Sequence, residues 1–328
     1  MKTVRWGIIG CGNVTEVKSG PAFQKAAGSQ LVAVMRRDTA KAQDYAQRHG
    51  VPTWYSDAQA LIDDPDVDAV YIATPPHMHL AYTLAAAQAG KPVYVEKPMA
   101  LTTAQCQEMI AACQAAGVPL FVAYYRRALP RFLKVKELLE GGAIGSLRCA
   151  RIDLALPLQV PPPGELPWRL DPQIAGGGLF VDLASHMLDY LDFILGPIQS
   201  VFGFAANQAG AYPAEDIVSA VFEFKSGVQA TGQWCFNGSG TADRIELIGA
   251  SGKISLTTFD DSPVVLETAS GRETFAISNP AHIQQPLIQQ AVDELRGAGK
   301  CSSTGETALR TTRVMEQLLS GYYSTSQI

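Results

Sequence analysis

The feature that most restricts the fold of this chain is a glycine-rich turn directly after its first apolar run. Residues 4–9 read VRWGII, and Gly10-Cys11-Gly12-Asn13-Val14-Thr15 follows them. In such a turn the first glycine permits a tight reversal, the second lets the backbone approach a pyrophosphate, and the next helix offers free amide hydrogens. A lone G-x-G also occurs in ordinary turns. Because this one opens a strand–helix–strand unit, it predicts a dinucleotide site.

Apolar runs and helical segments then alternate as far as residue 122. Strands are predicted at 4–9, 31–35, 69–73, 92–95 and 119–123. The intervening helices are a segment broken near Gly20-Pro21, 40–49 (capped by Thr39 and ended by Gly50), 79–89 and 103–116. Strands that are apolar throughout and separated by helices are typical of a parallel sheet covered on both faces. Residues 1–122 are therefore predicted to form an α/β domain of the doubly wound, Rossmann type.

The pattern changes from residue 123 onward. A helix at 131–141 leads into partly alternating runs at 146–155, 198–206, 216–225, 228–236, 243–248 and 253–258, with helices at 178–195, 283–297 and 305–320. Alternation broken by glycine turns predicts an α+β domain with a large, mostly antiparallel open sheet over residues 123–328. The proline-rich segment Pro157–Pro172 is either a rigid surface loop or a wall of the substrate pocket.

Composition excludes several classes of protein. Among 328 residues, 26 Lys and Arg stand against 31 Asp and Glu, so the net charge of −5 gives no footprint for nucleic acid. No apolar run approaches the roughly 18 residues of a membrane helix, and the N-terminus shows no signal peptide. The spacings of the six cysteines match neither a zinc nor a redox motif, which predicts reduced thiols in a cytoplasmic protein.

The end of the second strand bears on which dinucleotide is bound. An acidic residue about 20 positions beyond the glycine turn would hydrogen-bond the ribose 2′-hydroxyl of NAD. That position is Met35, and Arg36 and Arg37 follow it. Two guanidinium groups would bind a 2′-phosphate, so NADP is favoured and NAD is the alternative cofactor. The competing interpretation is that the two arginines pair with Asp38.

Two further loops follow predicted parallel strands, at the sheet edge where ligands bind. The first is Thr74-Pro75-Pro76-His77-Met78-His79, and the second is Glu96-Lys97-Pro98. The H-x-H spacing lacks a nearby Cys or acid to complete a metal site, so no metal is predicted. His77 or His79 is expected to cap the next helix or to contact the cofactor. Lys97 is expected where the nicotinamide lies.

A second polar cluster lies downstream. Gly176-Gly177-Gly178 precedes Asp182, His186 and Asp189, which the helical period places on one face. An Asp–His pair orients the imidazole and stabilises its charged form. Taken alone, such a pair is an ordinary feature of a partly exposed helix. Together with Lys97 and the glycine turn, it favours acid–base chemistry.

These motifs, in this order and at these spacings, resemble those of the Gfo/Idh/MocA family of oxidoreductases over nearly the whole chain. The resemblance implies an NAD(P)-binding domain at 1–122 and a substrate-binding and oligomerisation domain at 123–328. It implies hydride transfer between nicotinamide and a secondary alcohol or ketone of a sugar, cyclitol or dihydrodiol, by a homo-oligomer (a dimer or tetramer). Thr15, in place of a third glycine, and the missing acid at Met35 depart from the family pattern.

The site residues follow from the motifs and the resemblance together. Three are expected to be catalytic: Lys97, Asp182 and His186. His186 is the candidate general acid/base, Lys97 would bind the same oxygen and could share the proton, and Asp182 would hold the substrate hydroxyl or the imidazole. Cofactor contacts are expected from Gly10, Cys11, Gly12, Asn13, Val14, Arg36, Arg37, Thr74, Pro75, Pro76, His79, Glu96, Lys97, Trp168 and Arg169.

Two other functional classes remain open for this fold. One is a non-enzymatic regulator that senses a dinucleotide, which would be expected to lose Lys97 or His186. The other is a glycoside hydrolase that retains NAD and uses it only transiently. Tight NAD retention would favour the hydrolase, whereas a 2′-phosphate site suits an exchangeable NADPH.

Overall fold

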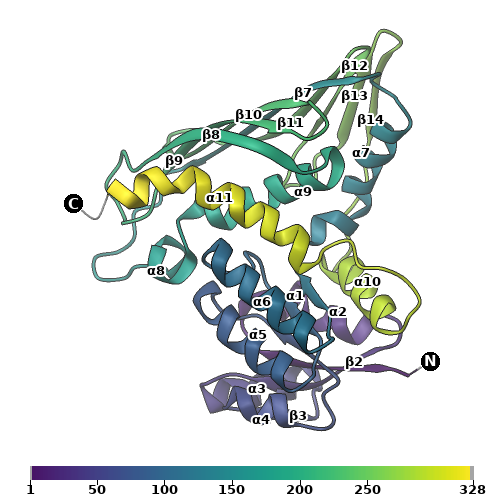
Figure 1. Ribbon diagram of the computed structural model, residues 1–328, viewed down its shortest axis with the longest axis vertical. Helices are drawn as coiled ribbons and strands as arrows, with labels where there is room; N and C mark the ends of the chain where they lie inside the picture. The colour runs from purple at the N-terminus through teal and green to yellow at the C-terminus, as the bar shows by residue number, and fades with distance from the viewer. Residues whose placement is uncertain (1, 326–328) are drawn as a thin grey trace. The chain divides into compact units, whose positions relative to one another are not determined.

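The computed structural model describes residues 2–325 (Figure 1). The chain divides into two compact units, one formed by the residues up to Ala128 with Pro280–Leu309, the other by Leu129–Asn279 with the residues from Arg310 onward. This division differs from the boundary expected at 122/123, because a late segment returns to the first unit. Ser303 Oγ donates to the carbonyl of Val122 at 2.7 Å, which fixes that segment beside the last strand of the first sheet.

The first unit contains a six-stranded sheet in the order β3-β2-β1-β4-β5-β6, and every neighbouring pair is parallel. The strands are β1 (Val4–Ile9), β2 (Ser29–Met35), β3 (Thr53–Tyr55), β4 (Ala69–Ile72), β5 (Val93–Val95) and β6 (Leu120–Val122). All four residues of β4 are buried, so the sheet is covered on both faces. The strand order reverses between β1 and β4, which confirms the Rossmann prediction.

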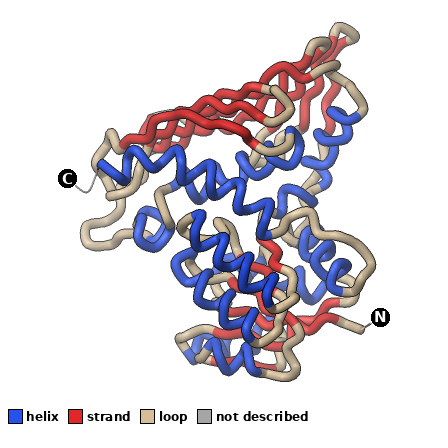
Figure 2. Tube along the Cα trace, viewed as in Figure 1, coloured by secondary structure: helices blue, strands red, loops and turns tan. Residues whose placement is uncertain are grey.

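Helices connect these strands (Figure 2). They are α1 (Asn13–Val17), α2 (Gly20–Lys25), α3 (Thr39–His49), α4 (Ala58–Asp63), α5 (His79–Gln88) and α6 (Thr103–Ala115), with a short 3₁₀ turn η1 (Pro76–Met78). The unit also holds the 3₁₀ turn η2 (Tyr125–Ala128) after β6 and, from later in the chain, α10 (Gln285–Leu295). The cap of α3 is Asp38 rather than the expected Thr39, because the Asp38 carboxylate accepts the Lys41 amide at 3.2 Å. Gly50 ends that helix in the left-handed conformation, as predicted.

The second unit contains an eight-stranded sheet in the order β14-β13-β12-β11-β7-β10-β9-β8. Its strands are β7 (Leu147–Pro157), β8 (Ile198–Ala206), β9 (Ile217–Phe224), β10 (Gln229–Gly238), β11 (Ala242–Gly249), β12 (Gly252–Leu256), β13 (Val264–Thr268) and β14 (Gly271–Phe275). Among the strand pairs that residues 2–325 form in this sheet, only β7–β10 is parallel, so the mostly antiparallel prediction is confirmed. Along β10, Ala230, Trp234 and Phe236 are buried while Gln229 and Thr231 are exposed.

The helices of this unit are α7 (Pro130–Glu140), η3 (Trp168–Leu170), α8 (Pro172–Ala175), a π-helical turn η4 (Phe180–Ala184), α9 (Ser185–Leu195) and most of α11 (Gly305–Thr325). Figure 1 shows the later part of α11 along the sheet, where Gln317 Nε2 donates to the Val201 carbonyl of β8 at 3.1 Å. No helix within residues 2–325 combines the length and apolar character that crossing a bilayer requires.

Candidate active site

The glycine turn between β1 and α1 has the backbone that a dinucleotide cradle needs. Gly10 has a φ of +91°, and a Cβ at this position would lie 2.8 Å from Thr74 Cγ2, so only glycine fits beside the Thr74 loop. A Cβ on Gly12 would meet only the Gly10 carbonyl at 3.8 Å, which leaves that side of the turn open. Thr15 replaces the third glycine and closes the turn, because its hydroxyl accepts the Gly12 amide at 3.0 Å. These features fit a bound pyrophosphate.

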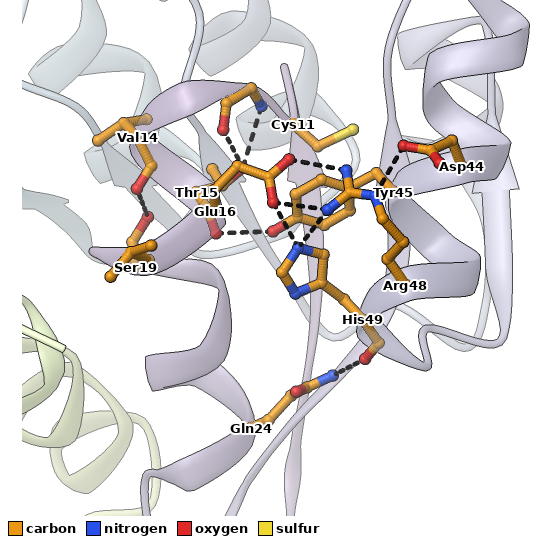
Figure 3. A network of polar contacts seen from close by, with 12 residues as sticks. Cys11, Val14, Thr15, Glu16, Ser19, Gln24, Asp44, Tyr45, Arg48 and His49 are labelled. Atoms are coloured by element: carbon orange, nitrogen blue, oxygen red, sulfur yellow. Dashed lines mark hydrogen bonds and ion pairs between the residues drawn. The ribbon is translucent and has the colours of Figure 1, made fainter. Parts of the chain in front are cut away.

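A polar network fixes α1 against α3 (Figure 3). The buried hydroxyl of Tyr45 donates to the Thr15 carbonyl at 2.8 Å. The Glu16 carboxylate accepts two hydrogen bonds from Arg48, at 2.9 and 2.8 Å, and lies 2.7 Å from His49 Nε2. The hydrogen bonds from Arg48 lower the pKa of Glu16 to about 2, so the pair stays ionised at neutral pH. The helix that follows the glycine turn is thus held from the side.

The two arginines after β2 lie close to this turn. Arg36 Nη1 donates to the Cys11 carbonyl at 3.3 Å, which brings its guanidinium to the glycine turn itself. Arg37 is exposed. Asp38 caps α3 and pairs with Lys41 Nζ at 3.3 Å. Lys41 is therefore the ion-pair partner of Asp38 within residues 2–325. The hydrogen bond from the Lys41 amide lowers the pKa of Asp38 most, and Arg36 lowers it only as a weaker, more distant charge.

His79 has a structural role and does not cap α5 with its side chain, whereas its contact with the cofactor stays a prediction. Its side chain is fully buried, with Nε2 2.8 Å from the Thr74 carbonyl and Nδ1 3.1 and 3.2 Å from the carbonyls of Pro98 and Met99. Burial lowers the pKa of His79. Because both ring nitrogens face backbone carbonyls, neither caps a helix amide. The ring instead ties the Thr74 loop to the segment after Lys97.

Glu96 lies behind Lys97 in a second buried network. Its Oε1 accepts hydrogen bonds from the Tyr71 hydroxyl at 2.6 Å and from Gln284 Nε2 at 2.7 Å, while the Lys97 amide donates to Oε2 at 3.2 Å. These contacts hold the Glu96 carboxylate within the protein, and its contact with the cofactor stays a prediction. Lys97 follows a fixed residue and precedes the backbone that His79 holds. Its main chain is therefore anchored on both sides at the carboxyl end of β5.

The second unit brings together Trp168, Arg169 and Asp182. Arg169 Nε lies 3.2 Å from Asp182 Oδ2, and its guanidinium lies 4.3 Å from the centre of the Trp168 ring. Asp182 belongs to the π-helical turn, whereas His186 belongs to α9, so the single helix expected over 178–195 is divided between these two residues. Turns of this kind occur frequently at functional sites.

His186 is 4% exposed, and its ring meets Phe259 edge-on at 6.1 Å. Sequence reasoning did not identify Phe259. Its loop is held by the Asp243 carboxylate, which accepts the amides of Thr258 and Phe259 at 2.9 and 2.6 Å. Nothing in the sequence near position 259 indicates this contact, because it depends on how β11 and the loop after β12 pack. Phe259 gives the His186 imidazole an apolar neighbour.

Residues 2–325 hold no cluster of three His, Cys, Asp or Glu side chains that could bind a metal ion. All six cysteines are free thiols. The chemistry available to the described residues is thus that of a dinucleotide cradle, an anchored lysine and an Asp–His segment.

Comparison with known proteins agrees with this geometry. Residues 4–124 match the model of the oxidoreductase family with an NAD-binding Rossmann fold, and residues 132–255 match the GFO/IDH/MocA C-terminal domain. The chain belongs to the Gfo/Idh/MocA family of oxidoreductases. It is therefore an NAD(P)-binding oxidoreductase with the two-part organisation of that family.

Members of this Gfo/Idh/MocA family resemble the chain over nearly its full length. Oxidoreductase P35 of Formosa agariphila is 39% identical, with 95% of this chain and 97% of the relative covered. The 1,5-anhydro-D-fructose reductase of Ensifer adhaerens is 31% identical, with 92% and 91% covered. The crystal structure of aldose–aldose oxidoreductase from Caulobacter crescentus with glycerol superposes with a TM-score of 0.87, at 25% identity, over 99% and 98% of the two chains.

Proposed function

We propose that this protein is a dehydrogenase or reductase that prefers NADP and acts on a secondary alcohol or ketone of a sugar, cyclitol or related diol. The observation that carries the proposal is Lys97, anchored on both sides at the ligand-binding edge of a Rossmann sheet. The similarity to a 1,5-anhydro-D-fructose reductase supports the substrate class. We also propose a cytoplasmic location, which the six free thiols support.

The bound dinucleotide would supply or accept the hydride. The residues of the chain must then move a proton to or from the substrate oxygen and hold that oxygen in place. We propose that His186 transfers the proton to or from the substrate oxygen. Lys97 would donate a hydrogen bond to the same oxygen. Asp182 would accept a substrate hydroxyl, in competition with its present partner Arg169. Trp168 and Arg169 are proposed to border the nicotinamide and substrate.

The direct test is turnover. The purified protein would be mixed with NADPH or NADH and a panel of ketoses, anhydrosugars and inososes, and oxidation of the nicotinamide would be followed by absorbance. We expect one substrate class to be reduced with NADPH. Nucleotide binding without turnover across the panel and in the reverse direction would favour a regulator. Nucleotide that stays bound through purification, together with glycoside cleavage, would favour the hydrolase.

Removal of the two arginine side chains is expected to weaken the binding of NADPH more than that of NADH. In Arg36→Ala/Arg37→Ala, loss of charge-assisted bonds of about 1.5–3 kcal/mol should raise the Kd for NADPH by roughly 10- to 100-fold. The Kd for NADH should change little, because it has no 2′-phosphate. Calorimetric titration of both nucleotides measures the difference, with Lys25→Ala as an exposed cation control. An equal loss for NADPH and NADH would contradict the phosphate assignment.

We propose that the subunits of a homo-oligomer pair through the open face of the eight-stranded sheet. Phe202, Phe204 and Val221 are 65%, 72% and 51% exposed on β8 and β9, and the two phenylalanine rings pack edge-on at 5.3 Å. Such an exposed apolar group on one sheet face is typical of an interaction surface. One such face can pair two subunits, so of the predicted dimer and tetramer it accounts for the dimer.

Phe204→Glu is accordingly expected to convert the dimer to a monomer, because it would bury a charge at the interface. Light scattering after size-exclusion chromatography would measure the mass. Val160→Glu is the matched control, since Val160 is also 72% exposed but lies on the proline-rich loop. A dimer that survives Phe204→Glu would place the interface elsewhere.

A further inference from the structure

A buried carboxyl group that takes no part in the proposed chemistry lies just before β9. Glu215 is fully buried, its Oε1 accepts the Gly178 amide at 2.8 Å, and its Oε2 accepts the Tyr323 hydroxyl at 2.5 Å. None of the ion pairs formed by residues 2–325 includes Glu215. A buried carboxyl group without a cation is costly, so its retention calls for a reason.

The glycine cluster is shaped around this residue. A Cβ on Gly177 would lie 3.2 Å from Glu215 Oε1 and 2.4 Å from Val181 Cγ2. A Cβ on Gly178 would lie 2.8 Å from the Glu215 carbonyl oxygen. Any larger residue at either position would push the turn away from Glu215. The sequence motif Gly176-Gly177-Gly178 is thus explained in part by the close approach of this side chain.

The same turn leads directly to a residue of the candidate active site. The Gly178 carbonyl accepts the Asp182 amide at 3.3 Å, within the segment that begins the π-helical turn. The Asp182 side chain in turn meets Arg169. The two hydrogen bonds of the Gly178 backbone therefore connect the Glu215 carboxyl group to the main chain of Asp182.

The opposite side of Glu215 is held by the last helix of the chain. Tyr323 belongs to α11, and its ring packs edge-on against Tyr322 at 4.9 Å. The Tyr322 hydroxyl donates to the Pro213 carbonyl at 3.1 Å, two residues before Glu215. The end of α11 thus fixes the segment that carries Glu215.

We propose that Glu215, supported by Tyr323, is a positioning residue that holds the glycine turn and thereby fixes where the π-helical turn presents Asp182. The proposal rests on the function proposed above for Asp182. Neither Glu215 nor Tyr323 is assigned a contact with substrate or cofactor.

The charge of Glu215 gives the proposal a measurable signature. Burial raises the pKa of Glu215 to about 7, against the hydrogen bonds from Tyr323 and Gly178. The titratable groups around it are Tyr323 and Tyr322 on α11, Asp216 beside it in sequence and Tyr212 in the preceding loop. An ionised carboxylate is the stronger acceptor for the Gly178 amide. That hydrogen bond should therefore strengthen as the pH rises through 7.

The contribution of Glu215 to the stability of the folded state changes with pH in the opposite direction to the strength of this hydrogen bond. Because the folded state binds the Glu215 proton more tightly than the unfolded state, its stabilising effect is complete below the ordinary glutamate pKa and is lost as the pH rises through about 7. Glu215→Gln removes this titration. We expect the melting temperature of the wild type to fall relative to that of Glu215→Gln between pH 5 and 8.

The positioning role itself is tested by NMR of the full-length protein, without any substrate. With ¹⁵N-labelled glycine and aspartate, the Gly178 and Asp182 amide resonances should titrate together near pH 7 in the wild type and stay constant in Glu215→Gln. Asp216→Asn is the matched control. Asp216 is also buried, but its carboxylate accepts the amides of Gln208 and Ala209, so the titration of Gly178 and Asp182 should persist.

Kinetics supply the second measurement once a substrate is found. Glu215→Ala is expected to lower kcat by about 10- to 100-fold through displacement of Asp182, with the cofactor Kd unchanged, and Glu215→Gln should restore most of the loss. If Glu215→Ala does not fold, Tyr323→Phe is the alternative variant, because it removes the hydroxyl that donates to Glu215 and nearly keeps the volume of the side chain. It should lower kcat in the same direction.

The outcomes separate the two proposals. Gly178 titration without any response of Asp182 would overturn the positioning role, as would a normal kcat in both Glu215→Ala and Tyr323→Phe. Coupled titration of Gly178 and Asp182 in a protein with no turnover on any polyol or ketone would instead overturn the proposed function and leave the structural link intact.

Discussion

Lys97→Ala is expected to lower kcat by about 10²- to 10⁴-fold, the range for a group that takes part in proton transfer or holds the reacting oxygen. The expectation follows from the anchored backbone of Lys97, fixed before it by Glu96 and after it by the carbonyls that His79 holds. The substitution keeps the Lys97 amide, Glu96 and His79, which make these contacts, so we expect the fold to be retained, and circular dichroism checks it. Stopped-flow and steady-state assays would measure the loss.

Two further variants show what causes the loss of kcat in Lys97→Ala. Lys97→Arg keeps a positive charge but cannot release its proton near neutral pH. A partial recovery of kcat in Lys97→Arg would indicate that charge and hydrogen bonding matter more than proton transfer. Lys25→Ala, an exposed lysine of the same unit, should be indistinguishable from the wild type. Near-normal turnover of Lys97→Ala would remove Lys97 from the mechanism.

The parts of the fold that sequence patterns predict well are those with a strong local signal. The five predicted strands of the first unit are continuous apolar runs, which match β1, β2, β4, β5 and β6 to within one or two residues. The missed strand β3 has only three residues, and the missed α4 only six. In the second unit β14 reads GRETF and is almost wholly exposed, so no alternation marks it. Short or polar elements form because neighbours pair with them, which local periodicity does not reveal.

The site shows the same limit at the level of single residues. The position of Lys97 at a strand end was predictable, but one hydrogen-bond partner of Glu96 is Gln284, 188 residues away. His79 and Glu96 lie in the predicted loops, yet their side chains turn into the protein and hold the backbone around Lys97. A motif therefore indicates where a functional backbone lies. Which of its side chains face the ligand depends on contacts between distant segments.

His186→Asn tests the assignment of the proton. Histidine is the side chain whose ordinary pKa lies nearest neutrality, so a general acid/base at this position should produce a limb of the pH–rate profile there. Asparagine keeps hydrogen-bonding capacity but does not titrate in this range. We expect kcat to fall by about 10²- to 10⁴-fold and the limb near neutral pH to disappear. The measurement is kcat and kcat/KM across the pH range.

The controls for His186→Asn are substitutions of two histidines that lie outside the proposed proton transfer. His282 is partly buried, with Nδ1 2.7 Å from the Val17 carbonyl oxygen, and has no role in the proposed site, so His282→Asn should leave the profile unchanged. His79→Asn should lower the melting temperature through its buried contacts but retain the neutral limb. If the limb persists in His186→Asn, the proton passes to Lys97, and Lys97→Arg should then abolish the limb. The two substitutions at Lys97 and His186 thus decide between the two candidate donors, because only one of them can remove the neutral limb while the other residue is intact.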